Sequence, residues 1–109
     1  MSESPLHQRI IELLRPVSPE RIYLFGSRVR SLETEESDID LLVVLPIDKA
    51  PESYSEKMEH VRRVRRLLGE LNKQYPLDLL VFTRPEWERF RTERPLFAAE
   101  IIENGKKIA

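Results

Sequence analysis

The stretch GSRVRSLETEESDIDL, residues 26–41, decides the fold of this chain, because it joins two predicted strands and brings polar residues to both ends of the join. Residues 21–25, RIYLF, precede it and predict a short β-strand. A second extended pattern, residues 39–45, begins at the end of this stretch. It is apolar on both faces from Leu41 onward, which is typical of a strand in the middle of a sheet. We therefore expect a strand, a turn with a short helical segment, and then a central strand.

Helical and extended patterns alternate through the rest of the sequence. Helix start signals stand at Ser4-Pro5, at the capping boxes Ser53-x-x-Glu56 and Thr83-x-x-Glu86, and at Pro95. Behind the first of these boxes, one apolar stripe runs from Met58 to Leu71. Extended patterns cover residues 77–82 and, at the end of the chain, 106–109. This order predicts an α/β (α+β) fold, in which a sheet of three or four strands is covered by helices.

The composition limits the kinds of protein that this chain can be. Its 109 residues fit a single domain spanning 1–109, and the absence of cysteine excludes disulfides and thiolate metal sites. The formal net charge of −1 gives no indication of nucleic-acid or membrane binding. The longest apolar run, 41–45, is far shorter than the ~20 residues of a membrane-spanning helix. With no secretory signal, we expect a cytoplasmic protein without a membrane partner.

Asp38 and Asp40 are the first candidate functional residues. They stand two positions apart at the head of the predicted central strand, so their carboxylates are expected on the same face. Carboxylates placed in this way repel each other and favour a bound cation, and Mg²⁺ prefers such oxygen ligands, often shared with substrate phosphates. The alternative is a solvated strand end, and the Asp-x-Asp pattern alone does not decide between them.

Two further features have the same double interpretation. Gly26-Ser27 lies where a strand gives way to a helical segment, a place that suits close approach of a phosphate, although an ordinary glycine turn has the same sequence. Asp78 lies within the apolar pattern of residues 77–82, where a carboxylate is costly unless it is paired, ligating or at the rim. It is either a third metal ligand that also accepts a proton from an attacking hydroxyl, or a strand-edge residue facing water.

Together these features form the pattern Gly-Ser, ten residues, Asp-x-Asp, and a later aspartate on a strand. In this the sequence resembles the nucleotidyltransferase superfamily that includes DNA polymerase β, and more closely the minimal nucleotidyltransferase (MNT) antitoxins of prokaryotes. Gly26-Ser27 and Asp38-Ile39-Asp40 match the GSx10DxD motif of that family without a gap, and the resemblance extends over nearly the whole chain. Many relatives have a second glycine where this chain has Ser31, which affects the expected shape of the phosphate loop.

The resemblance implies a polymerase-β-like fold with a small mixed sheet, and it implies a role for each candidate residue. Gly26 and Ser27 would hold the triphosphate, with Arg28 or Arg30 neutralising phosphate charge, although a solvated loop arginine is an equal alternative. The three aspartates, Asp38, Asp40 and Asp78, would bind two Mg²⁺ for an in-line displacement at the α-phosphorus of ATP. Asp78 would be the general base.

The resemblance also implies a partner. MNT proteins are typically encoded beside a small helical HEPN-domain RNase toxin and silence it by transferring AMP from ATP to a tyrosine of the toxin. We therefore expect an antitoxin that forms a hetero-oligomer with such a toxin. Two alternatives remain: a non-catalytic antitoxin that only binds its partner, and a small-molecule nucleotidyltransferase of the aminoglycoside type. Direct nucleic-acid contact through the basic cluster at 62–66 is the minority interpretation, because a solvated helix face has the same sequence.

Overall fold

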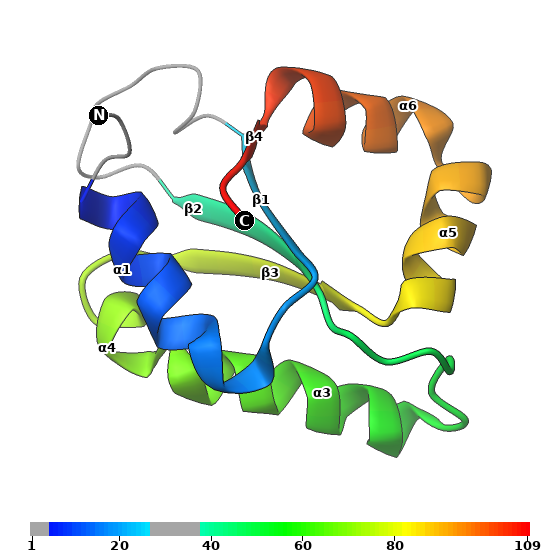
Figure 1. Ribbon diagram of the computed structural model, residues 1–109, viewed down its shortest axis with the longest axis horizontal. Helices are drawn as coiled ribbons and strands as arrows, with labels where there is room; N and C mark the ends of the chain where they lie inside the picture. The colour runs from blue at the N-terminus through cyan, green and yellow to red at the C-terminus, as the bar shows by residue number, and fades with distance from the viewer. Residues whose placement is uncertain (1–4, 27–37) are drawn as a thin grey trace.

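The computed structural model describes residues 5–26 and 38–109 (Figure 1). Helices and strands alternate along them in much the predicted order. In chain order the elements are α1 (Pro5–Leu14), η1 (Arg15–Val17), β1 (Arg21–Phe25), β2 (Ile39–Val44), α3 (Tyr54–Leu67), α4 (Gly69–Asn72), β3 (Leu77–Phe82), α5 (Arg84–Glu93), α6 (Pro95–Ala99), η2 (Glu100–Asn104) and β4 (Lys106–Lys107). The short helical segment expected after the first strand lies outside the described residues.

The four strands form one mixed sheet in the order β3-β2-β1-β4. β1 pairs antiparallel with both β2 and β4, whereas β2 and β3 run parallel. The predicted mixed sheet of three or four strands is therefore confirmed, as is the central position of β2, whose residues are buried except Asp40. None of the described helices is long and apolar enough to cross a membrane.

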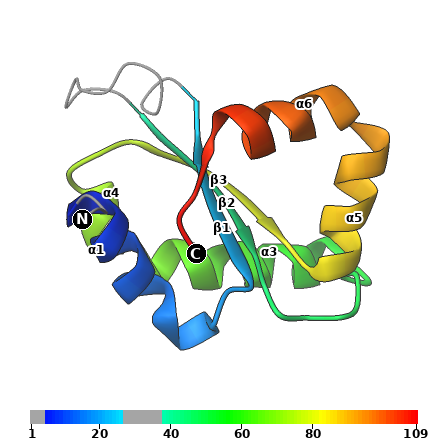
Figure 2. The ribbon, with the colours of Figure 1, turned by 45° about the horizontal axis from the view of Figure 1, so that its top comes forward.

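Two layers of helices cover the two faces of the sheet (Figures 1 and 2). Helices α1, α3 and α4 pack on one face, which we call the closed face. Its core is fully apolar, because alternate residues of β1, β2 and β3 meet apolar residues of these helices. The closed face contains, among others, Ile10, Leu14, Ile22, Leu24, Leu41, Val43, Val64, Leu71 and Val81.

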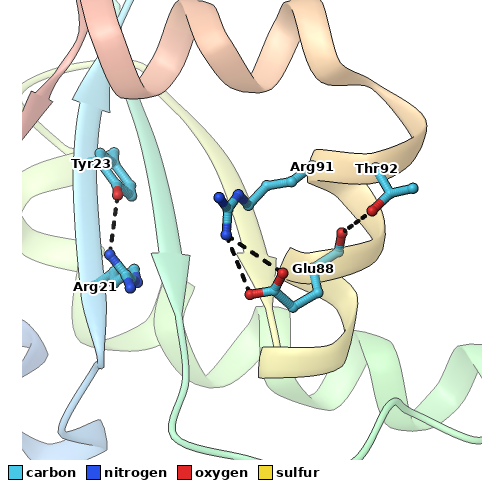
Figure 3. Close-up of polar contacts among 5 residues, drawn as sticks. All are labelled: Arg21, Tyr23, Glu88, Arg91 and Thr92. Atoms are coloured by element: carbon cyan, nitrogen blue, oxygen red, sulfur yellow. Dashed lines mark hydrogen bonds and ion pairs between the residues drawn. The ribbon is translucent and has the colours of Figure 1, made fainter.

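Helices α5 and α6 and the turn η2 lie on the other face, which we call the open face. The opposite set of alternate strand residues, including Tyr23 and Leu42, packs there against Trp87 and Ile101. The ring centroids of Tyr23 and Trp87 are 5.7 Å apart. Figure 3 shows polar side chains beside this small core: Arg21 donates to the Tyr23 hydroxyl at 3.4 Å. Across from this pair, Arg91 on α5 forms an ion pair with Glu88.

The helix starts were predicted well, but one helix is divided. Ser53 Oγ accepts a hydrogen bond from the Glu56 amide at 3.1 Å, and the Glu56 carboxylate accepts one from the amide of Glu52 rather than from that of Ser53. The single apolar stripe from Met58 to Leu71 belongs to two helices, α3 and α4, which are separated at Leu68. A glycine, Gly69, follows at the break, and glycine is a poor helix former.

Candidate active site

Asp40 and Asp78 lie side by side at one end of the open face. They are direct partners in the parallel register of β2 and β3, so their side chains project from the same face of neighbouring strands. The two carboxyl groups interact, and this interaction helps to raise the pKa of Asp40. Asp40 is half-buried and Asp78 is exposed. The structure thus brings together two predicted site residues that α3 and α4 separate in the sequence.

The electrostatics of this pair are unfavourable without a cation. Burial, the hydrogen bond to Asp78, and the negative charges of Asp78 and Asp38 raise the pKa of the Asp40 carboxyl from 3.8 to about 6. At neutral pH the carboxyl is therefore ionised against a free-energy cost. A divalent cation between the carboxylates would remove that cost, since it would replace repulsion with attraction.

Asp38 lies immediately before β2, two residues from Asp40, and is exposed. Its charge reaches Asp40, as the raised pKa of Asp40 shows. The chemistry of this donor set fits Mg²⁺, which takes carboxylate oxygens. Within residues 5–26 and 38–109, however, no three acidic, histidine or cysteine side chains converge into a ready metal site. Joint ligation by Asp38, Asp40 and Asp78 therefore stays a prediction.

Gly26 brings the end of β1 against the same carboxylate. Its φ of 87° is in the left-handed region that favours glycine. A Cβ at this position would lie 1.9 Å from Asp40 Oδ2, so no other residue allows the carboxylate to lie so close to the backbone. The glycine was predicted to serve a phosphate, and its contact with Asp40 is an additional role. The other members of the predicted loop, Ser27, Arg28, Arg30 and Ser31, lie outside the described residues.

Both aspartates face an open groove of about 270 Å³. Its other lining residues are Phe25, Leu79, Leu80 and Phe97. Sequence reasoning did not identify these apolar neighbours as part of the site. Leu80 could have been found, because it stands two residues after Asp78 and must share its face of β3. Phe97 could not, since nothing in the sequence shows that α6 returns to this end of the sheet.

Comparisons with known proteins bear on the family and the fold of this chain. The sequence profile of the nucleotidyltransferase domain family matches residues 7–108. A protein of Methanocaldococcus jannaschii named as a protein adenylyltransferase, MJ1379, is 44% identical over 48 residues, which are 44% of this chain and 47% of that protein. The chain thus matches about half the length of this curated relative.

Two solved structures share the fold. One, a crystal structure of a toxin–antitoxin complex with AMP-PNP, superposes with a TM-score of 0.62 at 22% identity, over 94% of this chain and 72% of that chain. The other, a mutant of the toxin–antitoxin pair MntA–HpeT, gives a TM-score of 0.57 at 20% identity, over 94% and 71%. The fold expected from the GSx10DxD resemblance is therefore confirmed. From the match over residues 7–108, this chain belongs to the nucleotidyltransferase domain family.

Proposed function

We propose that this protein is a Mg²⁺-dependent adenylyltransferase that transfers AMP from ATP to a tyrosine of a HEPN-domain RNase toxin. It would act as the antitoxin of a cytoplasmic toxin–antitoxin pair and form a hetero-oligomer with its partner. The observation that carries this proposal is the pairing of Asp40 with Asp78 beside the backbone of Gly26, in an open groove. Paired carboxylates that can hold divalent cations in an open groove are what phosphoryl-transfer chemistry requires.

Each residue would have a distinct part in the reaction. Gly26, Ser27 and Arg28 would hold the triphosphate at the end of β1. Asp38, Asp40 and Asp78 would hold two Mg²⁺, which when bound supply positive charge to the oxygens around the α-phosphorus. Asp78 is also exposed at the edge strand, where it would accept the proton of the attacking hydroxyl.

The relatives support the choice of nucleotide and partner. The archaeal relative is named for transfer of an adenylyl group to protein. One structural neighbour was crystallised with AMP-PNP, and both neighbours come from toxin–antitoxin complexes. The mutant neighbour carries two aspartate-to-glutamate substitutions two positions apart, which is the spacing of Asp38 and Asp40 here.

The direct test is metal-dependent labelling of the partner. The protein, Mg²⁺ and ATP labelled at the α-phosphate are incubated with the HEPN toxin proposed as its partner, and modified tyrosine is located by mass spectrometry. Label should appear with wild type, and should be lost with chelator, with Asp40→Asn and with Asp78→Asn. Glu59→Gln is the matched control, because Glu59 is an exposed carboxylate on α3, on the closed face of the sheet.

The same variants separate catalysis from binding alone. If Asp40→Asn no longer protects cells against the toxin but still co-purifies with it, modification is the mechanism of neutralisation. If the variant protects as well as wild type, and wild type leaves no label, the protein is a binding antitoxin and the proposal is wrong.

A further inference from the structure

A second groove continues from the aspartate site along the open face. It has a volume of about 400 Å³ and lies between β3 and the helices α5 and α6. Leu80 and Phe97 line both grooves, so the two grooves adjoin each other. Along β3, Asp78, Leu80 and Phe82 follow each other at alternate positions and share one face. A chain lying in the second groove would therefore lead directly to the carboxylate of Asp78.

Aromatic side chains form the wall of this groove. The ring centroids of Phe82 and Phe90 are 5.1 Å apart, and those of Phe90 and Phe97 are 5.3 Å apart. Phe97 nevertheless remains 40% exposed, although it packs edge-on against Phe90 and Phe25. The groove thus offers a preformed apolar surface to an aromatic or aliphatic side chain of a ligand.

One of the charged residues that line the groove, Arg94, differs from the others in its ion pairs. Glu86 pairs with Lys57 at 3.0 Å, and Glu93 pairs with Arg89 at 3.2 Å. Arg94 also lines the groove and is exposed, and it has no ion pair with any residue in 5–26 or 38–109. Arg94 is therefore the charged lining residue of this groove that has no ion pair among the described residues, and its guanidinium can pair with a carboxylate of a ligand.

The order of the site residues across the sheet shows which substrate reaches this groove. Gly26 follows β1, Asp40 lies on β2 and Asp78 lies on the edge strand β3, in the strand order β1-β2-β3. An in-line displacement needs the attacking and leaving groups on opposite sides of the phosphorus. If the triphosphate lies towards Gly26, the attacking hydroxyl must approach from the Asp78 side, where the second groove begins.

We propose that the groove lined by Phe82, Phe90, Arg94 and Phe97 binds the acceptor polypeptide, as a segment with an apolar or aromatic residue and a carboxylate beside the modified tyrosine. This inference rests on the proposed adenylyl transfer for the identity of the acceptor. It adds that this chain recognises the amino-acid sequence of the acceptor segment through the aromatic wall of the groove and through Arg94.

The test uses two fluorescein-labelled peptides of equal length. One carries glutamates on both sides of a Tyr-Leu pair, and the other carries lysines in their place. Fluorescence anisotropy should show that wild type binds the acidic peptide roughly 2- to 5-fold more tightly, as expected for one exposed charge interaction. Arg94→Glu should reverse this preference, and Arg94→Gln should abolish it. Phe97→Ala should weaken binding of both peptides, since both contain the Tyr-Leu pair.

Arg66→Glu is the matched charge reversal. Arg66 is an exposed arginine on α3, which packs on the closed face of the sheet, so the preference should remain that of wild type. Thermal melts of all variants establish that each is folded at the assay temperature. Equal binding of the two peptides by wild type, or an unchanged preference in Arg94→Glu, would refute the proposal that this groove binds the acceptor.

A transfer assay with the same peptides and labelled ATP separates this inference from the proposed function. The KM for the acidic peptide should rise in Arg94→Glu, while kcat and the KM for ATP stay unchanged. A rise in the KM for ATP instead would assign the groove to the nucleotide and refute the inference. Selective binding without any transfer would support the acceptor groove and contradict the proposed adenylyl transfer. Transfer without selectivity would support adenylyl transfer and contradict the acceptor groove.

Discussion

The two faces of the sheet use the same strands for different purposes. On the closed face, Leu41 and its neighbours are fully buried under α1, α3 and α4, with no charged side chain in the core. On the open face, one residue earlier along the same strand, Asp40 remains half-exposed beside Asp78. Because α6 reaches this end of the face with Phe97 and does not fill it, an open groove remains where the closed face has packed side chains.

This difference shows how a small fold can remain stable although it holds carboxylates that repel one another. Alternation along a strand sends neighbouring residues to opposite faces, so a core residue and a charged residue need no separate elements. Burial of apolar side chains on the closed face stabilises the fold, and this stabilisation offsets the repulsion between Asp40 and its acidic neighbours. Variants on the two faces should therefore separate activity from stability.

The largest effect is expected from Asp40→Asn on adenylyl transfer. Loss of one central carboxylate should reduce kcat by about a thousandfold, equivalent to about 4 kcal/mol of activation free energy. The measurement is initial-rate transfer to the toxin at saturating Mg²⁺. The free energy of unfolding should not fall, because no apolar contact is lost. A variant that unfolds instead of losing activity would contradict the division between the faces.

Leu41→Ala should have the complementary effect. Leu41 is fully buried on the closed face, and its truncation should lower the free energy of unfolding by about 3 kcal/mol. Urea denaturation measures this change, and transfer per folded molecule should stay close to wild type. The control is Leu80→Ala on the open face, where the side chain is only half-buried and the expected loss is about 1 kcal/mol. Equal losses would show that the faces do not differ as described.

Two glycines provide a third comparison. Gly26→Ala places a Cβ against Asp40 Oδ2 at a positive φ, and should cost about 2 kcal/mol of stability while it displaces the carboxylate. Gly69→Ala, at the break between α3 and α4, meets open space and should be neutral or stabilising by up to about 1 kcal/mol. Thermal melts combined with transfer assays distinguish the two. Full activity in Gly26→Ala would show that the close approach is unnecessary.

The smallest effect is a pH dependence of stability in metal-free buffer. Since folding raises the pKa of Asp40 to about 6, the folded state binds this proton more tightly than the unfolded state does. Stability from this group should therefore fall as pH rises from about 4 to about 6, and stay level above that. Asp40→Asn should raise the melting temperature above pH 6 by a few degrees, or about 1 kcal/mol after solvent screening, and leave it unchanged near pH 4. A constant difference at every pH would assign the effect to another cause.

Local sequence patterns were enough to predict the main elements and the family. Apolar periodicity predicted β1, β2 and β3, and the start signals at Ser53 and Thr83 predicted α3 and α5, because these signals are local. The GSx10DxD spacing predicted the nucleotidyltransferase family, since such chemistry constrains neighbouring residues of one loop and strand. The predicted functions of Ser27 and Arg28 lie outside the described residues and stay predictions.

The contacts between residues far apart in the sequence became known from the folded structure alone. The parallel register that places Asp40 opposite Asp78 depends on packing across two layers, and no local pattern fixes it. The return of α6, which brings Phe97 to the aspartates, likewise depends on the path of the chain after β3. The contact of Gly26 with Asp40 follows from the pairing of β1 with β2. Local chemistry can be read from neighbours in sequence, whereas a groove is made by contacts between segments that the sequence keeps apart.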